Sequence, residues 1–356
     1  MPSPKVSWQV AVALALLLLC GLWLLFRSQV LRILLAAALT VSVLAILAYC
    51  GIFSARQATS PRKQDRDTQA LAVFILVFSM LFALFSGDLV GNLGVWVAVM
   101  TLFVIFLAVL GVFVCGRPLG LLVDSRNRIS LSSFQTILWT VVILSAFFTA
   151  VAALLLAGKG TEAFNIGVDQ QLWALMGISV TTLAGTPLIR DVKSERTVRG
   201  SILQGYAMRH EKKVVEKALQ MGRVTRSQDQ SDAEVLRALM ADERALGDVL
   251  GAFLDGPLCK DKDPMTVPLI DIFMGDEVVN CNRLDLGKVQ MFFFTVVGAL
   301  VYMVILADWV TTLDANAPAI AFPALSSGFI AILGISHAGF LGNTAAPKTP
   351  EATPPS

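Results

Sequence analysis

Two stretches of the chain match each other and decide how the sequence is organised. They read Arg128-Ile-Ser-Leu-Ser-Ser-Phe-Gln-Thr-Ile-Leu-Trp-Thr-Val-Val142 and Arg283-Leu-Asp-Leu-Gly-Lys-Val-Gln-Met-Phe-Phe-Phe-Thr-Val-Val297, and Arg283 follows Arg128 by 155 positions. Ser130 and Asp285 coincide in this alignment, and both residue types cap the starts of helices. Each copy therefore predicts a helix that starts in water and enters the bilayer one turn later.

The next apolar segments match as well, because Gly177-Ile-Ser179 corresponds to Gly334-Ile-Ser336, 157 positions later. Small residues recur at every fourth position in both copies, so they share one helix face and let another backbone approach closely. The expected packing seam consists of Gly177, Thr181, Gly185, Gly334, Ala338 and Gly342. We expect a parallel repeat of two helical hairpins, related by an axis along the membrane normal.

The composition predicts an all-α, polytopic helical membrane protein. Of 356 residues, 56% are hydrophobic and 15% are charged, whereas soluble domains carry about 25% charged residues. A spanning helix needs about 20 mostly apolar residues. The sequence predicts about eight transmembrane helices, at Trp8–Phe26, Ile33–Phe53, Ala70–Ser86, Leu93–Gly116, Leu131–Ala157, Leu172–Ile189, Val289–Ala307 and Pro323–Ala345.

Charged residues are concentrated between the two copies. Residues 187–285, here called the charged domain, hold 15 Lys and Arg and 17 Asp and Glu, which is 32 of the chain's 54 charged residues. Such a segment must be exposed to water. The predicted division is a four-span block (1–116), a first repeat hairpin (122–190), a cytosolic helical domain (191–275), a second repeat hairpin (276–346) and a disordered tail (347–356) rich in Pro and Thr.

Two helices are expected within the charged domain. Ser231-Asp-Ala-Glu234 has the form of a capping box, and an apolar stripe of helical period then runs to Leu254, before Gly256-Pro257. A second stripe runs over residues 198–221. We favour an antiparallel hairpin in which the two stripes bury each other. The alternative is that the stripes leave an open groove that binds a partner.

The distribution of Lys and Arg predicts the orientation, because cytoplasmic connections carry an excess of both. With both termini in the cytosol, the outer connections hold only Arg27, Arg32 and Lys159. Arg27 and Arg32 lie in the first expected outer connection, so they oppose the predicted orientation of the first two spans. The expected location is the plasma membrane, with the lipid bilayer as the surrounding partner.

Several function classes lack their motifs. The net charge of +2 gives no basic surface for nucleic acid. The five cysteines lie far apart and there are only two histidines, so neither a disulfide framework nor a zinc site is predicted. No P-loop, G-x-S-x-G, H-E-x-x-H or dinucleotide fingerprint occurs. We therefore expect no enzymatic activity, no cofactor and no metal.

Candidate functional residues are few. His337 lies deep in an apolar run; a proton relay or pH sensor is one interpretation, and we favour an interhelical hydrogen bond. The repeat also pairs Gln135 with Gln290 and Thr140 with Thr295. These four polar positions are candidates for lining a shared pathway, but Gln and Thr five residues apart do not share one narrow helix face.

An acidic cluster precedes the seventh expected span. It contains Asp271, Asp276, Glu277 and Asp285. Carboxylates of this kind bind divalent cations, although the EF-hand pattern is not present. We favour ion pairs at the membrane surface with Arg126, Arg128 and Arg283, which are individually weak when exposed.

Three stretches of the sequence resemble a known group of proteins. Leu269-Ile-Asp-Ile-Phe-Met-Gly-Asp-Glu277, Asp285-Leu-Gly-Lys-Val-Gln-Met-Phe-Phe-Phe-Thr295 and Leu333-Gly-Ile-Ser-His-Ala-Gly-Phe-Leu341 resemble a group of bacterial multi-pass membrane proteins without an assigned activity. The resemblance is clearest over residues 122–145 and 265–345. It implies a bacterial inner membrane and no catalytic residue.

The function expected from these patterns is that of an integral membrane scaffold or sensor. Its cytosolic helical domain would engage a protein partner, and a homo-oligomer is possible in this interpretation. The alternative is a homo-oligomeric ion channel or transporter, whose pathway the duplicated hairpins would form. A water-accessible path across the repeat would distinguish the two.

Overall fold

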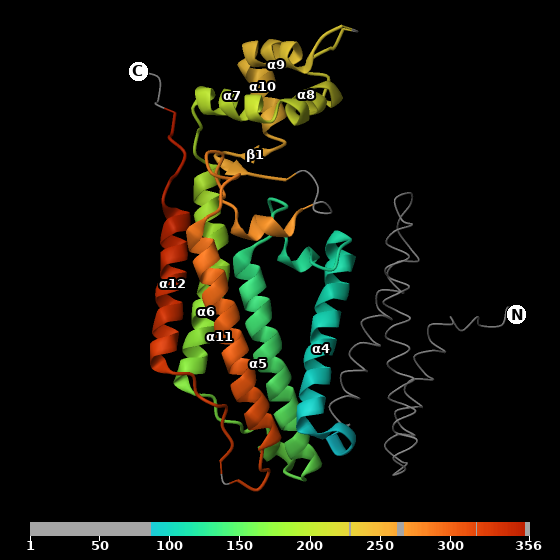
Figure 1. Ribbon diagram of the computed structural model, residues 1–356, viewed down its shortest axis with the longest axis vertical. Coiled ribbons are helices and arrows are strands. Elements are labelled where there is room, and N and C mark those ends of the chain that lie inside the picture. Colours follow the sequence, from blue (N-terminus) through green and yellow to red (C-terminus); the bar gives the residue numbers. More distant parts are fainter. Residues whose placement is uncertain (1–86, 228, 262–266, 318, 353–356) are drawn as a thin grey trace, which may run out of the picture. The chain divides into compact units, whose positions relative to one another are not determined.

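The computed structural model describes residues 87–352, except residues 228, 262–266 and 318. The first three expected spans, Trp8–Phe26, Ile33–Phe53 and Ala70–Ser86, lie outside the described residues. Five long helices follow (Figure 1): α4 (Gly87–Cys115), α5 (Leu131–Leu156), α6 (Gln170–Ser194), α11 (Leu286–Thr311) and α12 (Ser327–Ala345). Each is long and apolar enough to cross a membrane. The all-α membrane class is thereby confirmed.

The starts of these helices follow the predicted caps. Ser130 accepts a hydrogen bond from the backbone N–H of Ser133 at 3.3 Å, and Asp285 accepts one from that of Gly287 at 2.9 Å. The helices that follow these two residues, α5 and α11, are both 26 residues long. The side chain of Asp169 likewise accepts from the N–H of Gln171, at 2.9 Å, where α6 begins.

The chain divides into two compact units. Among the described residues, unit 1 comprises 87–121, 137–173 and 297–326 without residue 318. Within it, the Trp96 indole of α4 donates to the hydroxyl of Ser145 in α5 at 2.9 Å, and the rings of Trp139 and Tyr302 lie 6.3 Å apart. The short helix η2 (Gly160–Phe164) follows α5. Gly167 and Ala321 form a parallel β-bridge between the two connections of this unit.

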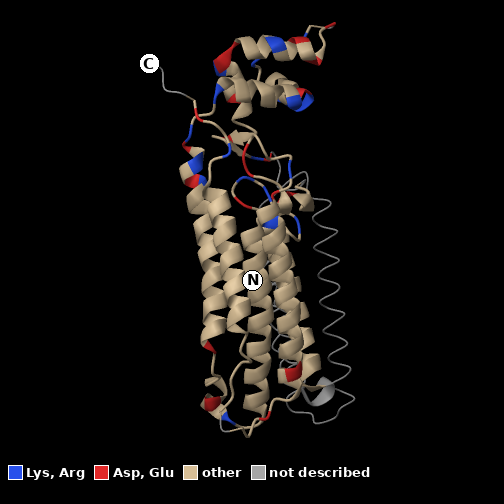
Figure 2. Ribbon diagram, turned by 60° about the vertical axis from the view of Figure 1, so that its left-hand side comes forward, with Lys and Arg blue, Asp and Glu red and all other residues tan. Residues whose placement is uncertain are grey.

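Among the described residues, unit 2 comprises 122–136, 174–296 without residues 228 and 262–266, and 327–352. It contains most of α6, all of α12, the first turns of α5 and α11, and the four short helices of the charged domain. The helix η1 (Gly120–Leu122) ends at Leu122, the first residue of unit 2. The helix η3 (Leu269–Phe273) lies within the charged domain, before α11. Figure 2 shows Lys, Arg, Asp and Glu gathered in the short helices, the connecting segments and the ends of the long helices.

The two helices expected in the charged domain are each broken into two, which corrects the prediction. They are α7 (Gly200–Arg209), α8 (Glu211–Gln220), α9 (Asp232–Ala241) and α10 (Glu243–Leu250). The capping box at Ser231 and Glu234 is present. The second break follows from Asp242, whose side chain accepts from the N–H groups of Arg244 and Ala245 and so caps a new helix. The expected burial of one stripe against the other holds, because α7–α10 share one apolar core.

A short β-hairpin follows α10 in the charged domain. Strands β1 (Leu254–Asp255) and β2 (Leu258–Cys259) pair antiparallel on either side of Gly256-Pro257. Gly256 has φ of 55°, and a Cβ there would lie 2.2 Å from the carbonyl oxygen of Ser194 at the end of α6. Only glycine allows the hairpin to approach the α6 terminus this closely.

The segment after α12 differs from the disorder expected for residues 347–356 as far as it is described. Glu351 forms an antiparallel bridge with Val198, and the N–H groups of Lys348 and Thr349 donate to Glu277 at 2.9 and 2.6 Å. A buried carboxylate therefore orders this segment despite its Pro-rich composition.

Candidate functional site

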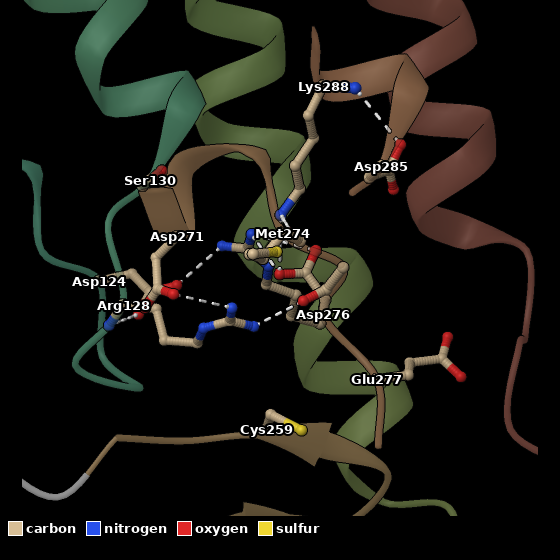
Figure 3. A network of polar contacts seen from close by, with 12 residues as sticks. Asp124, Arg128, Ser130, Cys259, Asp271, Met274, Asp276, Glu277, Asp285 and Lys288 are labelled. Atoms are coloured by element: carbon tan, nitrogen blue, oxygen red, sulfur yellow. Dashed lines mark hydrogen bonds and ion pairs between the residues drawn. The ribbon is translucent and has the colours of Figure 1, made fainter. Parts of the chain in front are cut away.

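A buried network of charges in unit 2 is centred on Asp276 (Figure 3). Its carboxylate accepts from Arg126 at 3.0 Å, from Arg190 at 3.3 Å and from Lys288 at 3.1 Å. Burial by itself would raise the pKa of Asp276, but the surrounding cations, with Arg190 foremost, hold that pKa well below its usual value. Asp276 is therefore an anion that three cations share.

The three cations come from separate parts of the sequence. Arg126 precedes α5, Arg190 lies near the end of α6, and Lys288 lies in the first turn of α11. The side chain of Lys288 reaches toward Asp276 (Figure 3) and also donates to the carbonyl oxygen of Met274 at 2.6 Å. One carboxylate thus joins the ends of two long helices to the segment that precedes a third.

Asp124 forms ion pairs with two of the same cations, Arg126 and Arg190. It accepts from Arg126 at 2.9 Å and from Arg190 at 3.1 Å. It also accepts from the backbone N–H groups of Arg126 and Arg128. Burial opposes ionisation of Asp124, but Arg126 and Arg190 outweigh it and lower its pKa. Two carboxylates and two guanidinium groups alternate here, so loss of any one leaves two buried charges with one partner fewer.

Glu277 forms a second buried ion pair directly beside the first. It is 2% exposed, and it accepts from the ammonium of Lys193 at 2.5 Å. Lys193 also donates to the carbonyl oxygen of Ala346 at 2.8 Å. Burial acts to raise the pKa of Glu277, and the hydrogen bonds from Lys193 and Thr349 lower it overall. Glu277 therefore ties the end of α6 to the segment that follows α12.

The other two members of the acidic cluster, Asp271 and Asp285, bind different partners. Asp271 pairs with Arg128 at 3.5 Å, and Arg128 also donates to the carbonyl oxygen of Gly275 at 2.6 Å. Asp285 accepts from the Asn343 amide at 2.9 Å, which links α11 to α12.

These contacts correct the predicted pairing in two respects. Arg126 and Arg128 do bind the cluster, but Arg190, Lys193 and Lys288 supply the remaining partners, and no ion pair of Arg283 is found in the part of the chain that the structure describes. The pairs are also buried, since Arg126 and Arg128 are 4% and 5% exposed. Within the described ranges no group of three or more His, Cys, Asp or Glu side chains is arranged to hold a metal ion.

His337 lies in a hydrogen-bonded cluster between helices. Its Nδ1 and the hydroxyl of Thr182 in α6 are 2.7 Å apart, and its Nε2 is hydrogen-bonded to Gln135 in α5. Thr136 and Ser179 form a further link between α5 and α6 at 3.4 Å. The geometry agrees with the interhelical hydrogen bond expected for His337.

The equivalent polar positions of the repeat have different surroundings. Gln135 is 1% exposed and Thr295 is fully buried, whereas Gln290 and Thr140 are exposed. The two residues of each pair that the alignment makes equivalent therefore differ in burial.

The small residues of the expected packing seam also face outward for the most part. Gly177, Thr181, Ala338 and Gly342 are exposed, and a Cβ on Gly177 would meet no atom within 4 Å. Close contact occurs at only two positions, where a Cβ on Gly185 would lie 3.5 Å from Leu341 and one on Gly334 would lie 3.6 Å from Ile178. The buried face of α6 instead carries polar residues: Ser179, Thr182, Thr186, Arg190 and Lys193.

A cavity of about 590 Å³ adjoins the network within unit 2. Its lining includes Arg128, Tyr206, His210, Lys213 and the carboxylates of Asp261 and Asp271. Burial, together with a hydrogen bond to Asp271, raises the pKa of Asp261 to about 6. The cavity therefore offers both cationic and acidic groups to a small molecule.

Comparisons with known proteins supply no further assignment. No family model matches the chain, and neither a curated protein nor a solved structure matches it significantly. The resemblance to bacterial multi-pass membrane proteins stays a prediction that the quoted stretches carry.

Proposed function

We propose that the chain is an integral membrane sensor or scaffold, in which the charged domain engages a protein partner and the Asp276–Glu277 dipeptide transmits that engagement to the membrane helices. One observation carries the proposal. Asp276 and Glu277 are consecutive residues, and together they accept from α6, α11, the segment before α5 and the segment after α12. A shift of this dipeptide relative to α6, α11 or the segment before α5 breaks a buried ion pair, and a shift relative to the segment after α12 breaks hydrogen bonds to Glu277.

The energetics of these buried ion pairs favour an element with two alternative arrangements over an element with a single rigid one. Buried ion pairs lose most of their Coulombic attraction to desolvation, so they add little net stability, yet removal of one partner is costly. A partner that binds only one arrangement of the dipeptide shifts the population of arrangements by its difference in affinity. The helices that share these pairs would respond together.

The remaining features of the proposal rest on sequence patterns, and parts of the structure support them. Equal lengths of α5 and α11, and caps at Ser130 and Asp285, support the parallel repeat. The Lys and Arg distribution supports a cytosolic charged domain. The resemblance supports a bacterial inner membrane, and the outward-facing Gly177 and Gly342 are compatible with a homo-oligomer.

A photo-crosslinking amino acid at exposed positions tests the engagement of a partner. Lys212 of α8 and Arg237 of α9 are exposed positions in the charged domain, and Thr161 of η2 is a matched exposed position outside it. We expect one discrete protein adduct in living cells from Lys212 or Arg237 and not from Thr161. The same adducts from all three positions, or none from the charged domain, would contradict the proposal.

The channel alternative has one observation in its favour. The Gln135–His337–Thr182 cluster places polar groups inside apolar helices, and such groups mark ion pathways in membrane proteins. Purified protein in liposomes, assayed for ion flux with and without His337→Leu, distinguishes the two. The sensor account predicts no flux in either case.

A further inference from the structure

Two cysteines that are distant in the sequence lie side by side in unit 2. The backbone N–H of Cys259 in β2 donates to the carbonyl oxygen of Asp276 at 2.8 Å, and that of Cys281 donates to the carbonyl oxygen of Glu277 at 2.7 Å. Since Asp276 and Glu277 are consecutive, with Cα atoms about 3.8 Å apart, the two cysteines are held together. The Cys281 thiol donates to the carbonyl oxygen of Val278 at 4.0 Å.

The pair is accessible as well as close. Both cysteines line the 590 Å³ cavity, with Arg128 in the same wall. Cys259 is 6% exposed, whereas Cys281 is partly exposed. Both are free thiols. A small molecule in the cavity therefore reaches Cys281 more readily than the buried Cys259.

The surroundings give the two thiols different reactivities. The neighbouring Cys259 thiol lowers the pKa of Cys281, and Arg128 lowers it further. The Cys281 thiol and burial raise the pKa of Cys259. Because Cys281 is the more exposed of the two and the thiolate is the nucleophile in disulfide exchange, Cys281 is the attacking residue and Cys259 the resolving one.

We propose that Cys259 and Cys281 are a dithiol modification site that closes to a disulfide when a low-molecular-weight disulfide enters the cavity. The Cys281 thiolate attacks one sulfur of the reagent, which forms a mixed disulfide and releases one thiolate. The Cys259 sulfur then attacks Cys281, which forms the protein disulfide and releases the second thiolate. The reagent gains two electrons, and the two protons of the protein thiols pass to the two released thiolates.

Peptide mass mapping after treatment with glutathione disulfide tests this site in the full chain. The background carries Cys20→Ala and Cys50→Ala, and it retains Cys115 as an internal control, since Cys115 of α4 is a free thiol outside unit 2. We expect a linked pair of peptides containing Cys259 and Cys281, lighter by two hydrogens, that disappears on reduction. Cys115 should carry at most a mixed disulfide.

Single substitutions test the order of attack. Cys259→Ser should trap a mixed disulfide on Cys281, and Cys281→Ser should leave Cys259 at least tenfold less modified. Because the linked peptide is measured without changing either cysteine, misfolding of a variant does not decide the outcome. A chain in which Cys259 and Cys281 carry only separate adducts, or stay unmodified at reagent levels that modify Cys115, would overturn the proposal.

Discussion

Lys193 and Glu277 form an ion pair at 2.5 Å in which both side chains are almost completely buried, at 6% and 3% exposed. The pair lies next to the Asp276 network in the chain, and it joins the end of α6 to a loop that begins more than 80 residues later. Charges so placed are costly to separate and add little when matched. They therefore influence which arrangement of the connected elements is populated more than they add to overall stability.

A double-mutant cycle at this pair should show strong coupling. Lys193→Met and Glu277→Gln each leave a buried group without its partner, so each should lower the free energy of unfolding by about 3–5 kcal/mol. The double variant should lose clearly less than the sum of both losses. Denaturation in detergent measures the free energy of unfolding of the wild type, both single variants and the double variant. Additive losses would show that the pair is not coupled.

The dependence of stability on pH should have two components of opposite sign. The pKa values of Asp124, Asp276 and Glu277 are lowered from 3.8, 3.8 and 4.5, so their stabilisation is present above these values and is lost as the pH falls below them. The pKa of Asp261 is raised from 3.8 to about 6, so its contribution is present below 3.8 and is lost as the pH rises through 6.

The variant Asp261→Asn separates these components. Its melting temperature should lack the decline between pH 4 and 6 that the wild type shows, and it should keep the loss at lower pH. Melting curves from pH 3 to 8 in one detergent measure both. A wild-type profile that rises steadily from pH 4 to 6 and is unchanged by Asp261→Asn would be inconsistent with a raised Asp261 pKa.

Two glycines of the small-residue pattern should respond differently to enlargement. Gly334→Leu places new atoms against Ile178, because even a Cβ there would lie 3.6 Å away, and it should destabilise the contact between α6 and α12 by about 1–3 kcal/mol. Gly177→Leu meets open space and serves as the matched control. Thermal stability of the monomer in detergent is the measurement. Equal losses in both variants would contradict the packing described here.

Among the described residues, the sequence predicted the five long apolar helices well. It predicted the short helices of the charged domain less well, for physical reasons. Helices such as α5 and α11 are determined by local apolar runs and caps, which periodicity reports directly. The break at Asp242 depends on one side chain that caps a new helix in place of continuing the old one. Apolar spacing does not distinguish these outcomes, because both keep the same residues buried.

The partners in the charge network could be predicted only in part. Acidic residues before α11 were evident, but their partners Arg190 and Lys193 lie at the end of a span, where Lys and Arg usually indicate only orientation. One local signal did exist. Ser179, Thr182, Thr186, Arg190 and Lys193 recur at intervals of three and four, and this spacing marks one polar helix face.

The orientation can be tested with an impermeant thiol reagent on intact cells. A chain without native cysteines and with one cysteine at Gln230 should be shielded, and one with a cysteine at the exposed Thr161 should react. The reason is the excess of Lys and Arg on the side of the charged domain. Permeabilised cells provide the control, in which both positions should react. Labelling of Gln230 from outside would reverse the proposed topology.

Hydrogen exchange of full-length Asp276→Asn protein tests the central claim most directly, that this carboxylate couples the charged domain to the membrane helices. Exposed Asp255 supplies the matched control, Asp255→Asn. We predict faster exchange in Asp276→Asn at residues 131–136 and 286–296, at the end of α6 and in helices α7–α10, and no change in the control. Faster exchange confined to residues 271–280 would show that Asp276 acts only locally, and it would contradict the account.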